Sequence, residues 1–498
     1  MKANLNPNQL VSFLDKTPND FTKNDIIRFI ESNEIKMVNF RYMGEDGRLK
    51  TLNFNINSKK HLDSLLSSGE RVDGSSLFSY IEAGSSDLYV IPRFKTAFLN
   101  PFTEIPSLDI LCSYFNKEGK PLSSSPEYIL KKAHQTLTEK TGFTYETMGE
   151  LEYYVISKNE ELYPVSDQRG YHESAPFAKW GTLRTEAMQA IAKAGGLIKY
   201  GHSEVGNFTL DNISYEQNEI EFLPTNVEDA ADQLVIAKWI IRMVAYKHGV
   251  TISFAPKITE GKAGSGMHIH TRLMKNGKNV MVENGQISDT AKKAIAGYLQ
   301  LSSSLTAFGN TIPTSYFRLV PHQEAPTNIC WGDRNRSVLV RVPLGWTGSS
   351  NMMKIANPLE TGEQNDYSDK QTVEFRCPDG SADIYLLMAG LTVAARHGIE
   401  TENALEIAKK SYVDVNIFKD EHKEVCENLE QLPVSCWESS ESLAKHADIY
   451  KKYNVFSERI IEGMITKLKG YNDKELRKSI SNNPKEILKL VNQYLNFA

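Results

Sequence analysis

Pairs of polar or charged residues recur in five short stretches that have the character of β-strands. Side chains alternate across a strand, so residues two positions apart point to the same face and the residue between them points to the other. The intervening residues here are apolar: Leu151, Ile220, Ile269 and Phe375. The pairs are Glu150 and Glu152, Glu219 and Glu221, His268 and His270, Arg336 and Arg341, and Glu374 and Arg376.

Carboxylates, imidazoles and guanidinium groups on one face of a sheet would together bind metal ions and phosphate. Carboxylate oxygens are the ligands that Mg²⁺ and Mn²⁺ prefer, and an imidazole is compatible with Mn²⁺. A guanidinium group offers paired donors to phosphate or carboxylate oxygens and keeps its charge at neutral pH. A single glutamate on a strand is as often a solvated surface residue. The combination therefore predicts a cationic site for a polyphosphate.

The composition is that of a globular protein large enough for more than one domain. The chain has 498 residues, of which 40% are hydrophobic, and a formal net charge of −5. This mildly acidic balance argues against a general nucleic-acid binder. Five scattered cysteines without metal-ligand spacing favour reduced thiols and a cytoplasmic location. The N-terminus has no apolar signal region, and the most apolar helical stretch is interrupted by Lys238, Arg242 and Lys247, so neither secretion nor a membrane span is expected.

Local signals divide the chain into two parts. Residues 24–33 predict a helix, and residues 38–56 predict a β-hairpin that turns at Glu45-Asp46-Gly47. The segment KEGKPLSSSPE is rich in Lys, Gly, Ser and Pro and predicts a boundary between residues 116 and 126. We therefore expect domains at 1–122 and 123–498. The second part alternates strands with amphipathic helices that end at glycines, and it becomes helix-rich after Gly398.

The order of the motifs resembles that of the glutamine synthetase family. GELEYY, HSEVG, QNEIEF, GSGMHIH, RLVPHQEAP, RNRSVLVR and VEFRCPDGSA follow one another, and the earlier VDGSSLFSYIEAGSSDLYVIP is similar to the family's N-terminal signature. The resemblance implies an α+β fold, with a small β-grasp N-terminal domain and a larger catalytic domain built on an antiparallel sheet with surrounding helices. It also implies a homo-oligomeric ring, a dodecamer, with active sites at subunit interfaces.

The same resemblance implies roles for individual residues. Two or more Mg²⁺ or Mn²⁺ ions are expected in each active site. One ion would be held by Glu152, Glu204 and Glu219, and the second by Glu150, His268 and Glu374. Arg318, Arg376 and Gly264 would bind L-glutamate, with Glu152 beside them, whereas Arg336 and Arg341 would face the transferred phosphate and His270 the nucleotide. Asp73 and Ser76 of a neighbouring subunit, with Tyr171 and Glu204, would bind ammonium. Asp73 would favour its deprotonation by accepting a proton, and Glu324 would close over the intermediate.

The implied reaction joins ammonia to the γ-carboxylate of L-glutamate through γ-glutamyl phosphate, with ATP as co-substrate. One alternative is a γ-glutamyl amine or polyamine ligase of the same fold, which would keep the metal ligands and arginines and change the amine pocket. A non-catalytic scaffold or regulatory relative is a further alternative, although such a protein would be expected to lose metal ligands. The sequence departs from many family members in having His-Ser-Glu at 202–204 and a longer segment between Glu204 and Glu219.

Overall fold

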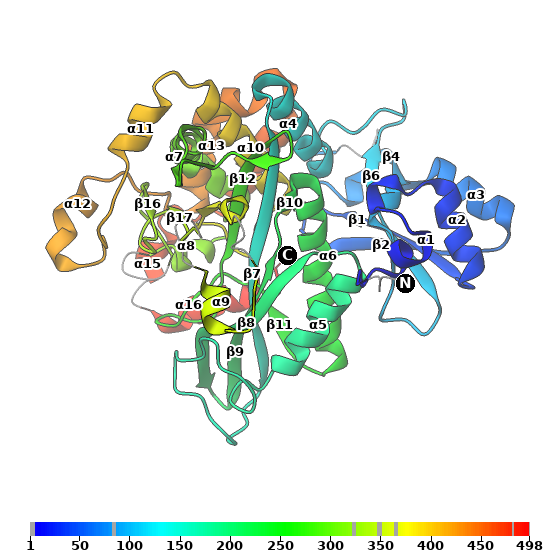
Figure 1. Ribbon diagram of the computed structural model, residues 1–498, viewed down its shortest axis with the longest axis horizontal. Coiled ribbons are helices and arrows are strands. Elements are labelled where there is room, and N and C mark those ends of the chain that lie inside the picture. The colour runs from blue at the N-terminus through cyan, green and yellow to red at the C-terminus, as the bar shows by residue number, and fades with distance from the viewer. Residues whose placement is uncertain are drawn as a thin grey trace.

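Two β-sheets organise the chain, one formed before residue 116 and one after it. The computed structural model describes residues 5–81, 86–320, 325–345, 351–362, 367–480 and 483–497. In Figure 1 the N-terminal sheet, blue to cyan, lies beside the larger sheet, and helix α6 (Val227–Lys247) runs between the two.

The N-terminal sheet is mixed, with strand order β2-β1-β6-β4-β3 and β5 paired with β6. Strands β1 and β6 are parallel, and the other pairs are antiparallel. The predicted hairpin is confirmed: Met43 pairs with Leu49, and Gly47 in the turn has φ 73°, a conformation that favours glycine. The strands are Met37–Met43 (β1), Leu49–Asn55 (β2), Glu70–Asp73 (β3), Asp87–Pro92 (β4), Phe98–Leu99 (β5) and Ser107–Phe115 (β6).

Three helices cover this sheet and share its hydrophobic core. They are Gln9–Leu14 (α1), Lys23–Ser32 (α2) and Lys59–Ser68 (α3). The helix predicted over 24–33 is α2, whose Ile26, Phe29 and Ile30 face the core beside Phe40 and Ile110 of the sheet. The rest of the chain has its own core, on which Phe98 and Leu111 of the N-terminal sheet also pack.

The larger sheet has strand order β16-β17-β18-β12-β7-β9-β8, with β10 and β11 on β7 and β13 on β12. Its pairs are antiparallel except for β16 with β17, so the expected antiparallel catalytic sheet is present. The strands are Thr144–Lys158 (β7), Ile198–Leu210 (β8), Ile213–Phe222 (β9), Thr225–Asn226 (β10), Thr251–Ser253 (β11), Met267–Lys275 (β12), Lys278–Asn279 (β13), Trp331–Asp333 (β16), Val340–Val342 (β17) and Val373–Phe375 (β18). A separate small hairpin joins Val282–Glu283 (β14) to Gln286–Ile287 (β15).

Helices cover one face of this sheet and extend to the C-terminus. The predicted helices are Pro126–Thr141 (α4), Gly181–Lys193 (α5) and α6, and left-handed glycines follow each of them, at Gly142, Gly195 and Gly249. The others are Asp289–Gly309 (α7), Ser315–Arg318 (α8), Met352–Ala356 (α9), Ile384–Glu400 (α10), Ala404–Lys410 (α11), Lys423–Glu427 (α12), Cys436–Lys451 (α13), Glu458–Gly470 (α14), Leu476–Ile480 (α15) and Pro484–Tyr494 (α16).

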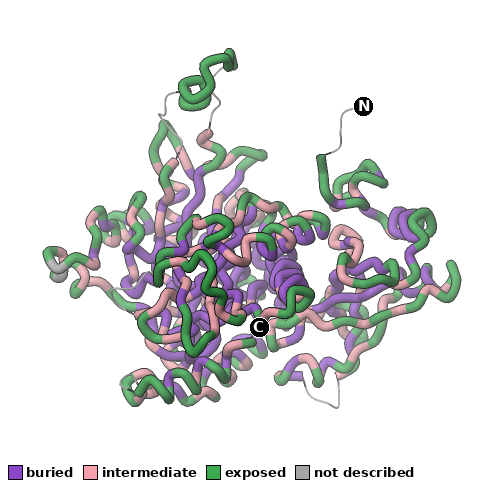
Figure 2. Tube along the Cα trace, turned by 90° about the horizontal axis from the view of Figure 1, so that it is seen from below, coloured by how far each residue is buried: buried purple, intermediate pink, exposed green. Residues whose placement is uncertain are grey.

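Burial is deepest where these helices meet the larger sheet, as the purple trace in Figure 2 shows. Leu151, Ile220, Ile269 and Phe375 are fully buried on this side. The predicted alternation is therefore confirmed, because these residues lie on the face away from the charged pairs, and the structure adds that helices cover that face. Within the described residues, no helix is long and apolar enough to cross a membrane.

Candidate active site

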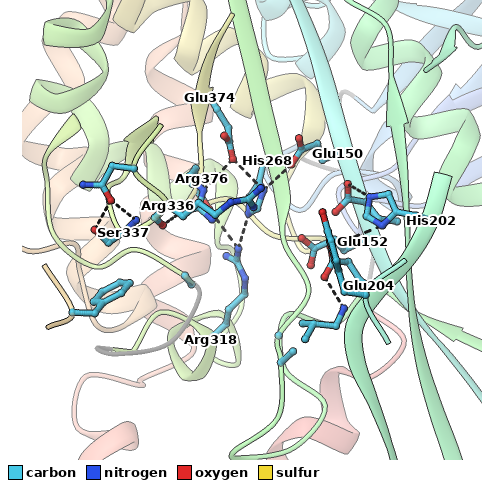
Figure 3. A pocket seen from close by; sticks show the side chains of 18 of the residues that line it. Glu150, Glu152, His202, Glu204, His268, Arg318, Arg336, Ser337, Glu374 and Arg376 are labelled. Carbon is cyan, nitrogen blue, oxygen red and sulfur yellow. Dashed lines mark hydrogen bonds and ion pairs between the residues drawn. The ribbon is translucent and has the colours of Figure 1, made fainter. Parts of the chain in front are cut away.

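A cavity of about 1250 Å³ opens on the face of the larger sheet that the helices leave uncovered. Figure 3 shows its carboxylates and histidines projecting from β7, β8, β12 and β18, with Arg376 beside Glu374 and Arg318 beside His268. Most of the predicted site residues line it: Glu150, Glu152, Tyr171, Glu204, Glu219, Gly264, His268, Arg318, Arg336, Glu374 and Arg376.

Strand register brings the charged pairs of different strands together. Glu150 on β7 lies opposite His268 on β12 and opposite Glu221 on β9. Glu152, two residues further along β7, lies opposite Glu219. Opposed residues in an antiparallel pair have their Cβ atoms about 5 Å apart, close enough for two side chains to share one ion. A shift of one residue in register would turn these side chains into the core.

Glu150, His268 and Glu374 form the first candidate metal group, with ligand atoms within 4.8 Å of one another. Glu150 Oε2 lies 2.8 Å from His268 Nδ1, and Glu374 Oε1 lies 3.5 Å from the same nitrogen. Burial alone would raise the pKa of Glu150, but His270 and His268 hold it well below its ordinary value. The pKa of Glu374 is also lowered despite burial, because Arg376 lies beside it. Both carboxylates are therefore ionised at neutral pH.

A second group within 4.8 Å consists of His202, Glu219 and Glu221. His202 Nε2 lies 3.4 Å from Glu219 Oε1, and the Tyr200 hydroxyl and Lys199 both donate to Glu221. Burial raises the pKa of Glu219 well above its ordinary value, and nearby carboxylates, Glu150 first, raise it further. A divalent cation would relieve this concentration of negative charge.

The predicted partners of Glu219 line the same cavity, although they are outside this second group. Glu152 Oε2 accepts hydrogen bonds from the backbone N–H of Gly266 at 2.7 Å and from Gln217 Nε2 at 3.1 Å. Glu204 Oε2 accepts from the backbone N–H of Val205 at 2.6 Å. The ligand set Glu152, Glu204 and Glu219 stays a prediction.

The arginines occupy two different positions. Arg318 and Arg376 are buried at the cavity wall, where Arg318 Nη1 donates to the Cys377 carbonyl at 2.8 Å and Arg376 Nε donates to Glu374 at 3.0 Å. Arg336 is exposed and lines the cavity, but it precedes β17 in a turn, so the expectation that it shares a strand with Arg341 is wrong. The five-residue spacing already excluded a common face, and Asn335 holds the turn by accepting from the Ser337 backbone.

Two glycines allow the site side chains to approach the backbone closely. A Cβ atom on Gly264 would lie 2.6 Å from the Pro256 carbonyl and 2.9 Å from Arg318 Cγ. A Cβ atom on Gly266 would lie 2.6 Å from Arg318 Nη2 and 2.8 Å from His268 Nε2. Only glycine fits these two positions without moving Arg318 or its surroundings.

Several predicted residues lie elsewhere. His270 is buried between Glu150 and Thr372, with each ring nitrogen 2.8 Å from one of them, and Arg341 Nη1 donates to Glu374 at 2.8 Å. Neither lines the cavity, because existing partners on the sheet already engage them. Asp73 and Ser76 belong to the N-terminal domain and also do not line it. Glu324 lies outside the residues that the structure describes.

Other cavity residues had no role assigned from the sequence. The His202 ring is tilted against that of His172, with centroids 4.4 Å apart, and His172 stacks on Tyr171 at 4.2 Å. Asn416 and Phe418 approach from the segment after α11. The sequence already placed Glu219 and Glu221 on one face of a strand. His202 is two residues before Glu204 in the same strand, so the alternation of side chains could have identified it. The segment at 416–418 carries no local signal for a site.

The donor set fits divalent Mg²⁺ or Mn²⁺. Clustered carboxylate oxygens suit hard cations, and the imidazoles of His202 and His268 are tolerated by Mn²⁺. The cavity is lined by none of the free cysteines, which are Cys112, Cys330, Cys377, Cys426 and Cys436. Among the described residues, no thiolate is therefore present there to favour a softer metal such as Zn²⁺.

Comparison with known proteins agrees with this architecture. The family model "Glutamine synthetase, catalytic domain" matches residues 123–486, and "Glutamine synthetase, beta-Grasp domain" matches residues 34–117. The chain is 29% identical over 471 residues to a glutamine synthetase of Aquifex aeolicus, covering 89% of this chain and 93% of the relative. It is 31% identical over 432 residues to one of Pyrococcus furiosus, covering 84% and 89%.

Solved structures support the same fold. The cryo-electron microscopy structure of Plasmodium falciparum glutamine synthetase has a TM-score of 0.74 at 20% identity, covering 91% of this chain and 96% of that one. A structure described as apo GmaS has a TM-score of 0.72 at 17% identity, covering 92% and 96%. With both domain models matched in order and the charged cavity in the larger domain, the chain belongs to the glutamine synthetase family of enzymes.

Proposed function

We propose that this enzyme joins ammonia to the γ-carboxylate of L-glutamate, converting ATP to ADP and phosphate and forming glutamine. The observation that carries the proposal is the cavity itself, which brings the carboxylate and histidine groups together with Arg318, Arg336 and Arg376. The acidic wall suits cations and an amine, whereas the arginines suit the carboxylates and phosphate of the reactants.

In the first step, a γ-carboxylate oxygen of glutamate attacks the γ-phosphorus of ATP. An oxygen–phosphorus bond forms, the bond to ADP breaks, and γ-glutamyl phosphate results. We assign Arg318 and Arg376, with Gly264, to binding the glutamate carboxylates, and Arg336 to the transferred phosphoryl group. Arg341 would act through Glu374, because its guanidinium already donates to that carboxylate. The protein contributes positioning and electrostatic stabilisation in this step.

Divalent ions would be held by the carboxylates and histidines of the cavity and would neutralise the negative charge of the polyphosphate. Glu150, His268 and Glu374 form one candidate group, and Glu219 takes part in the second with Glu152 and Glu204 or with His202 and Glu221. His270 holds Glu150 in position through a hydrogen bond between the His270 Nε2 atom and the Glu150 carboxylate. A nucleotide contact of His270 itself has no support in the cavity lining.

In the second step, ammonium gives up a proton to an acidic group that binds it, the resulting ammonia attacks the acyl carbon of γ-glutamyl phosphate, and the bond from that carbon to the phosphate oxygen breaks so that phosphate leaves. Tyr171 and Glu204 line the cavity and would contact ammonium there. Hydroxyls of Ser76, Ser75 and Ser86 hold the pKa of Asp73 below its ordinary value, so Asp73 is ionised and would attract ammonium. Asp73 and Ser76 lie outside the cavity of their own chain, which supports their contribution from a second copy in a homo-oligomer. We assign Glu324 to closing the cavity over the intermediate.

A γ-glutamyl amine ligase is the second candidate, and one observation favours it. Tyr171, His172 and His202 form a cluster of rings beside Glu219: Tyr171 stacks on His172 with centroids 4.2 Å apart, and the His202 ring is tilted against His172 at 4.4 Å. Aromatic faces next to carboxylates bind substituted ammonium ions through cation–π attraction. Tyr171 is also 53% exposed, so its ring is open to a larger amine.

Phosphate release decides between these functions. The purified protein is incubated with ATP, L-glutamate and Mg²⁺ or Mn²⁺, and ammonium is compared with methylamine, ethylamine and polyamines while the amide product is identified. We expect ammonium-dependent release that yields glutamine and stops when EDTA removes the metal. Preference for an organic amine would establish the second candidate, and then His172→Ala should reduce use of that amine more than use of ammonium. No product with any amine would contradict both proposals.

A further inference from the structure

A buried guanidinium without a carboxylate partner lies directly behind the second metal group. Arg184 on α5 is 9% exposed, and its Nη1 donates to Ser203 Oγ at 3.0 Å and to Asn218 Oδ1 at 2.5 Å. Among the described residues no carboxylate lies within ion-pairing distance of it. Burial lowers the pKa of Arg184, and the Glu216 carboxylate raises it only from further away. Burial of an arginine on these terms is unusual, because a charge removed from water normally requires an opposite charge.

The two acceptors of Arg184 face each other across β8 and β9. Ser203 pairs with Asn218 in the strand register, next to the pair of His202 with Glu219. Ser203 also precedes Glu204 in the chain. Because side chains alternate along a strand, Arg184 binds the back of the same two-stranded ribbon whose front carries His202, Glu204 and Glu219.

The backbone pairing becomes irregular at this point. After Ser203 and Asn218, the next paired residues are Asn207 and Glu216, so three residues of β8 oppose one of β9. Glu204 begins this irregular segment, and the regular ladder alone does not determine its position. Gln217 accepts from the backbone N–H of Gly206 at 3.0 Å within the bulge. The Arg184 bridge therefore lies at the last regular pair before the bulge.

Helix α5 is itself attached to β9, which determines where Arg184 lies. The Glu216 carboxylate accepts from the backbone N–H groups of Lys179 and Trp180, at 2.8 and 3.0 Å, just before the helix begins. Leu183, Ala187 and Ile191 pack on the core from the same helix. Strand β9 thus holds the start of α5, and α5 in turn holds β8 against β9.

We propose that Arg184 is a positioning residue for divalent-ion binding, which acts by clamping Ser203 to Asn218 and by placing a permanent positive charge behind the acidic wall. The clamp orients His202, Glu204 and Glu219 toward one another across the ribbon. Its charge reduces the mutual repulsion of the carboxylates in the absence of an ion. The inference rests on the proposed function only in assigning the ion site to that reaction.

The test is Mn²⁺ binding by the full chain, followed by the electron paramagnetic resonance signal of free Mn²⁺ at pH 7 without substrates. Arg184→Gln should weaken binding by about 10-fold or more, the range expected for loss of a group that orients metal ligands. Arg184→Lys, which keeps the charge but loses the planar donors, should recover part of that affinity. The matched control is Lys193→Gln, which removes the same charge from an exposed position on α5 and should bind Mn²⁺ like the unchanged protein.

Ser203→Ala is a milder second variant, in case Arg184→Gln fails to fold. It removes one hydrogen-bond acceptor of Arg184 and leaves the hydrogen bond from Arg184 to Asn218. It should weaken Mn²⁺ binding less than Arg184→Gln does. Wild-type affinity in both folded variants, or an equal loss in Lys193→Gln, overturns the inference. If the unchanged protein binds Mn²⁺ but forms no amide product, the proposed function fails, and the comparison of variants still decides the role of Arg184.

Discussion

Glu150 and Glu219 lie on the same face of the sheet, but their surroundings shift their pKa values in opposite directions. Glu150 lies between two imidazoles, which hold its pKa well below the ordinary value although burial opposes this. Glu219 is buried among other carboxylates, and its pKa is raised well above the ordinary value. Neighbouring acidic groups whose pKa values move apart are typical of functional sites. Cation binding would stabilise the ionised form of Glu219 most.

At the scale of single residues, we predict the effect of replacing Gly266. Gly266→Ala places a methyl group 2.6 Å from Arg318 Nη2 and 2.8 Å from His268 Nε2, so both side chains must move. Displacement of this order at a reacting centre costs about 100-fold in rate, and we expect at least that loss in kcat/KM for glutamate. Steady-state phosphate release measures it.

The control for this variant is Gly470→Ala. Gly470 ends α14, has no left-handed backbone conformation, and has nothing within 4 Å of an added Cβ. Its activity should equal that of the unchanged protein. Full activity in Gly266→Ala would mean that Arg318 and His268 tolerate displacement and are not placed as we propose.

At the scale of elements, β7 organises the site because it pairs with β9 on one side and β12 on the other. Its 15 residues carry Glu150 and Glu152 between the histidine strand and the second glutamate strand. Helix α6 connects the two domains, because it packs against the larger sheet and its Asp229 and Asp232 accept hydrogen bonds from the N-terminal domain. The position of each element depends on partners far away in the sequence.

Helix α2 provides a prediction at this scale. Its capping box joins Thr22 and Asp25, and the Lys16 ammonium lies 2.9 Å from the Asp25 carboxylate. The hydrogen bond from Lys16, followed by that from Thr22, lowers the pKa of Asp25 from 3.8 to about 2. Because the Lys16 side chain is 40% exposed, solvent screens its attraction to Asp25, and we expect the ionised carboxylate to contribute about 1 kcal/mol or less to folding at neutral pH.

Because the pKa of Asp25 is lower in the folded state, this contribution is fully present above the unfolded value of 3.8 and is lost as the pH falls toward 2. Asp25→Asn should therefore reduce the free energy of unfolding of the N-terminal domain at pH 7, and the difference from the unchanged protein should narrow as the pH falls from about 4 to about 2. Urea unfolding at each pH measures it. A difference that is constant with pH would show that the charge of Asp25 is not responsible.

At the scale of the whole molecule, the N-terminal domain docks on α6 through buried charge. Arg93 donates to both carboxylate oxygens of Asp232, at 2.7 and 2.9 Å, and the Tyr385 hydroxyl of α10 donates to the same carboxylate at 2.7 Å. Arg41 lies 4.4 Å from the ring centroid of Trp239 nearby. The domains are therefore joined by directional contacts as well as by apolar surface.

Arg93→Met should weaken this junction strongly. It leaves the buried Asp232 charge without its partner, and loss of one member of such a pair costs about 3 kcal/mol or more. We expect a lower thermal midpoint and separate unfolding of the two domains by calorimetry. Lys95→Ala at the same junction is the control: its pair with Asp229 is about one-third exposed on both sides, so the loss should stay below about 1 kcal/mol. Equal effects of both variants would contradict the assigned importance of Arg93.

Assembly gives the second prediction at this scale. If Asp73 serves the cavity of a neighbouring copy, Asp73→Ala and Arg336→Ala remove different halves of a shared site. Each variant alone should be inactive, and subunits mixed during assembly should regain about one quarter of the wild-type activity, the share of interfaces with both residues intact. Absence of recovery in mixed oligomers would place Asp73 outside the partner's active site.

The local pattern of the sequence determined which face of each strand is charged, where the hairpin turns and where the long helices end. These features depend on alternation, turn residues and glycine conformations, which act over a few residues. The same pattern identified most of the cavity lining. The family resemblance added roles for those residues, and the comparisons confirmed the family.

Only the tertiary structure decided which charged side chains meet. Strand register pairs His202 with Glu219 and brings His270 between Glu150 and Thr372. Strand register and helix packing also determine the turn that carries Arg336 and the hydrogen bonds of Arg184. Register and packing result from contacts between segments distant in sequence, which no local period encodes. For that reason the sequence determined the chemistry available to this protein, whereas the assembled sheet determined its arrangement.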